Sequence, residues 1–247
     1  MDTNDLTTTL FAVALFMVFA ATFLAGDIVG LIIEAQSARR WRMAAERMGF
    51  EFDGRKKKSH SLSELFLPAL IFPGAKETAF SYGQVMKCLK GRVQGFDLSI
   101  SDFTVWDFPT RGPVIYRAVI CVIKRDGIEL PGQIGLVKAR GVLSTGLGMN
   151  ETLKEYSFPE ERGFSSVYSL FGRKGSPPWV FTPDIRRFCL EHLREMDSLF
   201  VNEKELILIW SDKSPDRFPQ LVELAVGIAG KFVENVPSPA PFVRSEV

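Results

Sequence analysis

The chain has 247 residues, 46% of them hydrophobic, and its 30 basic and 29 acidic residues leave a net charge of +1. This balance excludes nucleic-acid binding through overall positive charge, and no basic patch interleaved with aromatic residues is found. Three widely spaced cysteines, Cys88, Cys121 and Cys189, indicate neither a disulfide framework nor a paired-cysteine metal site, which suits a reducing compartment. Beyond an anchor, the length fits one domain or two small ones.

The segment Leu6–Ala25 contains no charged residue and organises the rest of the chain. At about 1.5 Å per residue it covers about 30 Å, the thickness of the hydrocarbon core of a bilayer. Backbone groups in lipid must be satisfied within the segment, so we expect a transmembrane helix. A cleaved signal peptide and a buried soluble helix are the rival interpretations. The flank before Leu6 lacks the basic residues of a signal peptide.

The charges on either side of this segment predict its orientation. Asp2 and Asp5 precede it without any Lys or Arg, and basic residues follow it. By the positive-inside rule the N-terminus lies outside and the large domain lies in the cytoplasm, at the inner (plasma) membrane. The candidate membrane-surface residues are Arg39, Arg40, Arg42, Arg55, Lys56, Lys57 and Lys58.

These basic residues belong to a stretch, residues 37–58, with eight basic and three acidic side chains. They could bind anionic lipid head groups, at about 1 kcal/mol for each side chain near the surface. The simpler interpretation is a topology signal followed by a solvated loop, because any such anchor carries these charges.

Asp27 is the first charged residue after the span, and apolar character resumes with Ile28, Val29, Leu31, Ile32 and Ile33. An acid inside a membrane would indicate a proton or ion site, and with Thr22 it defines an alternative in which the chain is a subunit of an oligomeric membrane path. No second charged residue lies in the span to pair with Asp27. We therefore interpret it as interfacial, one turn below the hydrocarbon core.

A helix over Ser37–Met48 is predicted next, stopped by Gly49 and followed by a short strand at Phe50–Asp53 and a basic loop at residues 54–60. Ser61–Leu67 fits a short capped helix. The apolar, proline-bounded stretch Leu67–Gly74 is interpreted as a buried connection, with an exposed partner-binding patch as the alternative.

From Val85 onward the pattern changes to strands. Val85–Val93 and Phe96–Trp106 are predicted to form a hairpin around a Gln-Gly turn. Pro113–Ile123 is almost continuously apolar and is predicted to be a central strand. Ile128–Val137 is predicted to run back beside it as a second hairpin.

The C-terminal part is predicted to contain a strand at Phe164–Phe171 and then a helix, a hairpin and a helix. Thr182 and Pro183 have the signature of a helix start, and Asn202–Lys204 is the expected hairpin turn. Ser214-Pro215 is expected to open the last helix. The proline-rich tail after position 236 is too short to pack.

Few residues suggest chemistry. Cys189 and His192 lie three residues apart on one predicted helix face, which would suit a nucleophile and its base, although both are more typical of core packing. The Gly-rich segment Gly141–Gly148 lacks the lysine of a phosphate-binding loop and fits a flexible connection. His60 has no candidate partner. We therefore predict no catalytic residues, no metal site and no cofactor.

Three stretches resemble a loose group of bacterial single-pass membrane-anchored proteins that are themselves uncharacterised. They are the hairpin Leu89–Leu98, the pair Leu130-Pro131, and Phe164–Gly172 ahead of a terminal helix–hairpin–helix. The similarity covers roughly residues 40–235. It implies one N-terminal helix and a cytoplasmic α+β domain, and it carries no activity or site residues.

The expected fold class is α+β: an N-terminal transmembrane helix, then a mainly antiparallel sheet of hairpins packed with the helix–hairpin–helix. A sheet-barrel capped by a helix is the alternative. We expect an anchor (residues 1–36), a basic juxtamembrane helix and loop (37–60), the domain (61–236) and a disordered tail (237–247).

The expected function is that of a binding or scaffolding module at the inner membrane face. The alternatives are an enzyme acting on a membrane-associated substrate and the oligomeric membrane path that uses Asp27. The expected partners are the lipid bilayer, anionic lipid head groups and a protein partner or second copy, without nucleic acid.

Overall fold

The computed structural model describes residues 3–55, 57–58, 84–107, 114–125, 134–139, 153–173, 178–194, 196–202, 205–211 and 214–235. Several predictions lie outside these residues: the short helix at 61–67, the apolar connection at 67–74, the Gly-rich segment at 141–148 and the tail. The chain divides into two compact units, Met1–Met43 and Ala44–Val247.

Helix α1 (Thr3–Met48) is a single uninterrupted helix that includes both the expected span and the expected helix at Ser37–Met48. It ends in a Schellman motif, in which the Gly49 N–H donates to the Glu46 carbonyl (3.3 Å) and the Phe50 N–H donates to the Ala45 carbonyl (2.8 Å). Gly49 has a φ of +67°, which glycine adopts without strain, so the predicted stop is confirmed.

Among the residues whose side chains the structure describes, no helix is both long enough and apolar enough to cross a membrane. Much of the predicted span Leu6–Ala25 consists of positions whose side chains lie outside that set.

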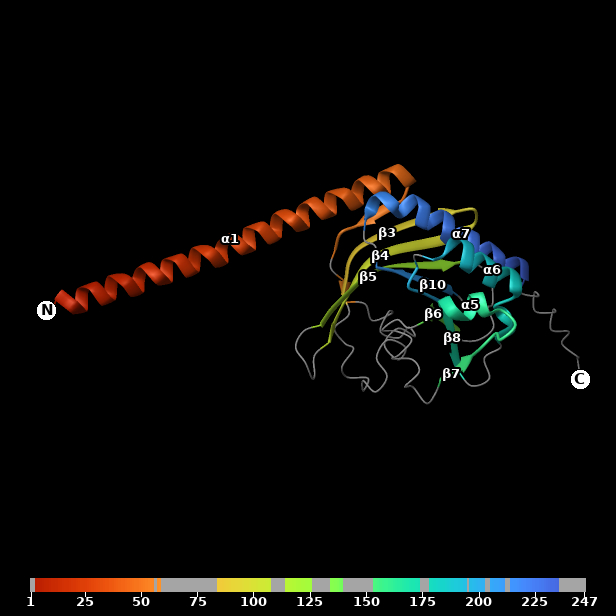
Figure 1. Ribbon diagram of the computed structural model, residues 1–247. Coiled ribbons are helices and arrows are strands. Elements are labelled where there is room, and N and C mark those ends of the chain that lie inside the picture. Colours follow the sequence, from red (N-terminus) through yellow and green to blue (C-terminus); the bar gives the residue numbers. More distant parts are fainter. Residues whose placement is uncertain are drawn as a thin grey trace, which may run out of the picture. The chain divides into compact units, whose positions relative to one another are not determined.

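The described strands of the second unit form one antiparallel sheet of ten strands (Figure 1). Its order is β1-β3-β4-β5-β10-β9-β6-β8-β7, and β2 also pairs with β3. β1 and β7 are the two edges of this sheet and do not pair with each other, so the described strands do not close into the alternative barrel. The strands are β1 (Glu51–Asp53), β2 (Lys57–Lys58), β3 (Gln84–Val93), β4 (Phe96–Asp107), β5 (Val114–Lys124), β6 (Ile134–Lys138), β7 (Leu153–Tyr156), β8 (Tyr168–Arg173), β9 (Ser198–Asn202) and β10 (Glu205–Trp210).

The β3–β4 hairpin forms where the sequence predicts it. Val93 pairs with Phe96 across a two-residue turn in which Gln94 and Gly95 both have positive φ, +51° and +83°. Two positive φ values are the signature of a type I′ turn, whose twist matches that of the flanking strands.

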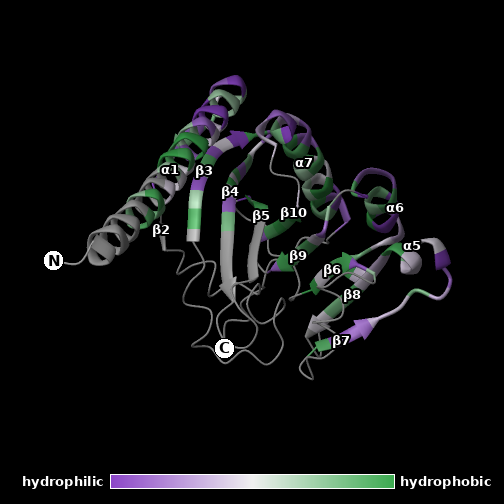
Figure 2. Cartoon of the chain, turned by 60° about the vertical axis from the view of Figure 1, so that its left-hand side comes forward, coloured by the Kyte–Doolittle hydropathy of each residue, from purple (hydrophilic) through white to green (hydrophobic). Residues whose placement is uncertain are grey.

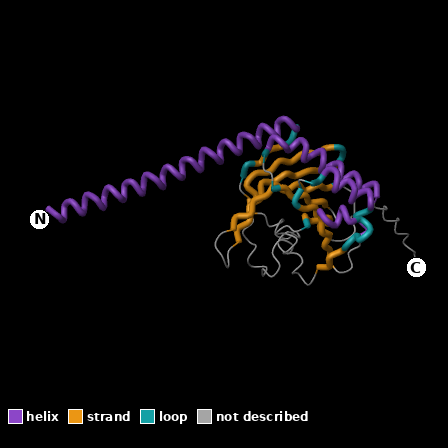
Figure 3. Tube along the Cα trace, in the orientation of Figure 1, coloured by secondary structure: helices purple, strands orange, loops and turns teal. Residues whose placement is uncertain are grey.

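Three helices pack on one side of this sheet: α5 (Arg162–Val167), α6 (Pro183–His192) and α7 (Phe218–Asn235) (Figure 3). The Thr182 hydroxyl accepts a hydrogen bond from the Ile185 N–H (3.4 Å), which confirms the predicted N-cap of α6. The phenol of Tyr168 donates to the Leu193 carbonyl (2.8 Å) and so ties β8 to the end of α6. The predicted helix–hairpin–helix is the order α6, β9, β10, α7.

The prediction for β5 was wrong about its partner. The described part of the predicted partner, residues 134–137, does not pair with β5. The neighbours of β5 are β4 and β10, and β6 pairs with β8 and β9. All six residues of β10 are buried, so this strand satisfies the two-sided burial that a central position beside β5 requires.

Three smaller predictions also need correction. Phe164–Phe171 is not one strand, because residues 164–167 belong to α5 and the remaining residues belong to β8. The Phe164 and Tyr168 rings pack together across this junction, with centroids 5.6 Å apart. The basic loop is interrupted by β2. A 3₁₀ turn, η3 (Pro215–Arg217), precedes α7, and a second, η2 (Pro178–Val180), precedes α6.

Candidate functional site on the helix-free face of the sheet

The register divides the sheet into two faces, because successive side chains of a strand point to opposite sides. The face turned away from α5, α6 and α7 is called the helix-free face, since no helix of the described residues contributes to its core. That core is an apolar cluster built entirely by strands: Val85, Phe103, Ala118, Ile120, Val137, Phe171, Phe200, Ile207 and Ile209. Figure 2 shows the hydrophobic character of β9 and β6 at its centre.

Phe200 is the largest fully buried side chain of this cluster, and a glycine makes room for it. Gly135 of β6 is directly opposite Phe200 of β9. A Cβ atom added at Gly135 would lie 2.5 Å from the Phe200 ring, far inside van der Waals contact. The missing side chain therefore leaves room for the Phe200 ring against β6.

One buried hydroxyl interrupts the apolar cluster. Ser198 is two residues before Phe200 and so faces the same side, between its cross-strand neighbours Val137 and Ile209. Its side chain is fully buried, and its Oγ makes no hydrogen bond to any described group. An unsatisfied buried hydroxyl is costly, so Ser198 is a polar defect within the apolar cluster.

The helix-free face leads into a charged recess of about 470 Å³ beside the β3–β4 hairpin. Lys90, Arg92, Asp97, Ser99 and Lys124 line it from this face, next to Val122. Glu51 of β1 completes the wall, directly opposite Lys90 in the register.

Ion pairs hold most of these charges in place. Arg92 Nε lies 3.5 Å from Asp97 Oδ1, and Lys124 Nζ lies 2.9 Å from Glu205 Oε2. The recess is therefore close to neutral, with donors and acceptors side by side. Its chemistry suits a polar or zwitterionic group rather than a strongly charged anion.

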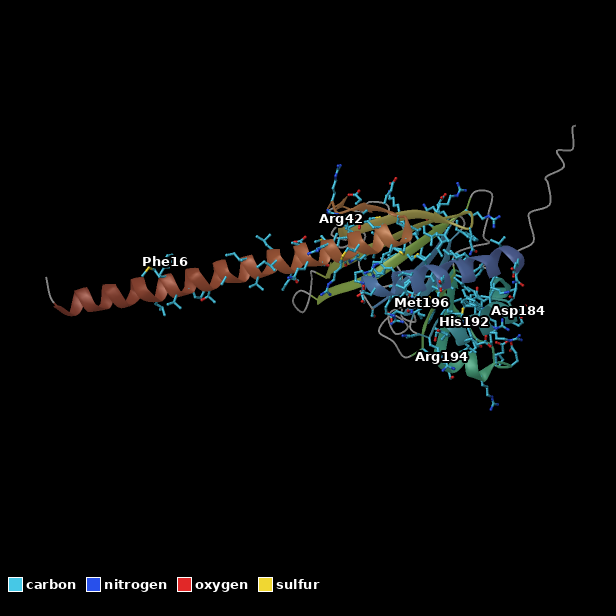
Figure 4. All side chains as sticks on the ribbon, turned by 90° about the horizontal axis from the view of Figure 1, so that it is seen from above. Phe16, Arg42, Asp184, His192, Arg194 and Met196 are labelled. Atoms are coloured by element: carbon cyan, nitrogen blue, oxygen red, sulfur yellow. The ribbon has the colours of Figure 1, made fainter. Side chains whose placement is uncertain are left out.

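A second surface of interest lies on α1. Leu15, Phe16, Met17, Val18 and Phe19 are consecutive, and each is 61–73% exposed (Figure 4). Consecutive helical residues are 100° apart, so these five side chains surround the helix on every side. A second exposed apolar run on the same helix comprises Ile28, Val29, Leu31, Ile32 and Ile33.

The candidate membrane-surface residues are distributed over both units. Arg39, Arg40 and Arg42 lie on α1 with exposed side chains. In the second unit, Arg55 is exposed and its N–H donates to Asp53 Oδ1 (3.0 Å). Lys57 and Lys58 form β2, and Lys56 lies outside the described residues. Their binding to head groups stays a prediction.

The Cys189–His192 hypothesis does not survive the structure. Cys189 is fully buried, and burial raises the pKa of its thiol to about 12, so it stays protonated at neutral pH. The His192 side chain is half exposed and its ring packs on Phe188, with centroids 4.7 Å apart. A buried thiol and a solvent-facing imidazole do not make a nucleophile and its base.

The Thr22 hydroxyl is used within its own helix, because it donates to the Val18 carbonyl (2.6 Å). Asp27 is the other residue of the alternative in which the chain is a subunit of an oligomeric membrane path, and its side chain lies outside the described residues. Among the described residues no group of His, Cys, Asp or Glu is placed to hold a metal ion.

Sequence reasoning missed the helix-free face and the recess. The signal for the recess was weak but present: Lys90, Arg92 and Asp97 alternate with buried residues around the predicted hairpin. Ser198 carried no signal, because one serine at the start of a strand is ordinary.

The comparisons with known proteins concern the fold. No protein-family model and no curated protein matches the sequence. The structure is similar to the crystal structure of the mycobacterial trehalose monomycolate transport factor A, TtfA, with a TM-score of 0.55 at 9% identity. The similarity covers 83% of this chain and 98% of that chain. At this identity it establishes a shared fold.

Proposed function

We propose that this protein is a single-pass membrane-anchored binding module whose α+β domain lies at the cytoplasmic face of the inner membrane. The observation that carries the proposal is the ring of exposed apolar side chains at Leu15–Phe19. Each large apolar side chain left in water forgoes about 1.5–3 kcal/mol, so five of them around one helix require an apolar environment. Lipid supplies it, and the uncharged stretch Leu6–Ala25 has the length to cross.

The orientation rests on charge. Asp2 and Asp5 precede the apolar stretch, and Arg39, Arg40 and Arg42 follow it with exposed side chains. The positive-inside rule then assigns the domain to the cytoplasm. These arginines would also contact anionic head groups and hold the domain close to the lipid.

The helix-free face is the proposed binding surface of the domain, and handling of a lipid or glycolipid is the binding function that we favour. The accessible part of this face is the recess, where nearly balanced charges lie next to Val122. That combination fits the polar part of an amphipathic molecule, and it fits a segment of a partner protein as the second candidate. The similarity in fold to a trehalose monomycolate transport factor supports the first of these.

A pull-down from membranes tests the proposal, comparing the full chain with a chain that lacks residues 1–36. We expect the full chain in the membrane fraction with a specific protein or lipid attached, and the shortened chain in the supernatant without it. Membrane association that survives the deletion would refute the anchor. Turnover of a substrate by either form would favour the enzyme alternative.

The Arg92→Ser variant alters the recess and separates binding from anchoring. Arg187→Ser on α6 is its matched control, because both arginines are exposed and each pairs with an exposed aspartate. We expect the first variant to lose the co-purified molecule and the second to retain it, with both chains still in the membrane. Equal retention by the two variants would move the binding surface elsewhere.

A further inference from the structure

The second exposed apolar run of α1, Ile28–Ile33, has no role if the bilayer ends at Ala25. The side chains of Ile28, Val29, Leu31, Ile32 and Ile33 are 51–67% exposed. At about 100° per residue they cover about 200° of the helix circumference, and positions 27 and 30 fall on the remaining side. The helix continues through residues 26 and 27 without a break, so both apolar runs belong to one continuous helix. The stretch from Leu6 to Ile33, in which Asp27 is the single charged residue, covers about 42 Å of helix and is longer than the hydrocarbon core.

We infer that the cytoplasmic boundary of the hydrocarbon core lies at Ile33, and that Ile28–Ile33 is a lipid-embedded part of the anchor. This inference rests on the proposed membrane anchor and goes beyond it, because it assigns lipid as the occupant of a surface that the span Leu6–Ala25 leaves in water. The segment in the core then starts near Ala14. The threonines at positions 7–9, which are the least apolar part of the first run, move to the outer interface.

The positions of the arginines support this boundary independently. The polar layer on each side of the core is about 5–8 Å thick, and with the boundary at Ile33 Arg39 follows it by about 9 Å of helix. With the boundary at Ala25, Arg39 would follow by about 21 Å, beyond the reach of the head groups. The exposed side chains of Arg39, Arg40 and Arg42 meet the lipid phosphates only in the first case.

The cost of this placement is one acidic residue, Asp27, within the embedded run. On insertion scales the penalty of an Asp at the centre of a span is about six times the gain from one Ile, and it falls toward the interface. Five large aliphatic residues therefore come close to offsetting it, because Asp27 is about 9 Å from the boundary and not at the centre. With the boundary at Ala25, the five aliphatic side chains would stay in water and their transfer free energy into lipid would be lost.

Cysteine labelling of the full chain in membrane vesicles tests the inference. The Cys88→Ser background retains two native thiols, both buried. Into it we would place Phe16→Cys, Ile32→Cys or Met43→Cys, and treat right-side-out and inside-out vesicles with a membrane-impermeant maleimide. We expect the thiol at position 43 to react from the cytoplasmic side, and those at 16 and 32 to react at least about tenfold more slowly until detergent is added.

The outcomes separate the inference from the function on which it rests. Fast labelling at position 32 with protection at 16 would overturn the boundary and leave the anchor standing. Fast labelling at both positions would overturn the anchor. Protection at 32 together with efficient oxidative cross-linking between copies would make a second copy the occupant and overturn the lipid assignment. A fluorophore at 32 that is quenched by spin-labelled lipid would support it.

Discussion

Replacing Arg186 tests how the domain holds its helices on the sheet. Arg186 of α6 is buried, and its guanidinium binds both carboxylate oxygens of Glu161, through Nε (2.9 Å) and Nη2 (2.5 Å). Nη1 donates to the Phe181 carbonyl (2.5 Å), and the guanidinium carbon lies 4.0 Å from the centre of the Phe158 ring. One side chain thus fastens the segment before α5 and the start of α6 together.

The expected cost of Arg186→Met follows from these contacts. Removing one partner of a buried ion pair costs about 3–5 kcal/mol. We take the lower end, about 3 kcal/mol, because Glu161 is partly exposed and water can solvate it in the variant. For a domain of this size that corresponds to a fall in the melting temperature of about 6–12 °C.

The assay is thermal and urea unfolding of the chain lacking residues 1–36, followed by circular dichroism. Arg187→Met is the matched control: it is the next residue on the same helix, and its pair with Asp184 (3.8 Å) joins two exposed side chains. An exposed pair contributes at most about 1 kcal/mol, so this variant should melt near the parent chain. Equal stability of the two variants would refute the reasoning.

Three further predictions follow from the same structure. The hydrogen bonds from Arg186 lower the pKa of Glu161, so the Glu161→Gln variant should have a smaller free energy of unfolding than the parent chain near neutral pH. This difference in free energy should vanish as the pH falls through the lowered pKa. A difference that stays constant with pH in urea titrations would contradict the prediction. Gly135→Val should destabilise by about 1–3 kcal/mol through overpacking, whereas Gly163→Ala, which has open space, should change little in the same melts. Burial raises the pKa of the Cys121 and Cys189 thiols to about 12, so an aromatic disulfide reagent at pH 8 should label them only after denaturation; native labelling would show that the core opens.

Local features could be read from the sequence because one or two residues decide them. The Gln94-Gly95 turn needs positive φ at two positions, and the α6 start needs a hydroxyl followed by proline; both occur as expected. The neighbours of β5 could not be read in this way. Its apolar run predicts burial on both faces, but β6 and β10 are both apolar enough to provide a partner.

The candidate site could not be predicted from the sequence, for a related reason. Alternation of apolar and polar residues marks a face only where the other side is wet, and β9 and β10 are buried on both sides. The pattern therefore does not tell which of their residues face the helices. Only the register reveals that Ser198 and Phe200 share the helix-free face.

The strand order has a consequence for how the chain acquires its fold during synthesis. The last hairpin made, β9–β10, is inserted between β5 and β6, which are made earlier. Until residue 210 has left the ribosome, β5 and β6 each present an unpaired edge, the kind of surface on which nascent chains aggregate. Long-range pairing of this kind also closes slowly. A premature stop between β8 and β9 would therefore leave two open half-sheets rather than a smaller folded domain.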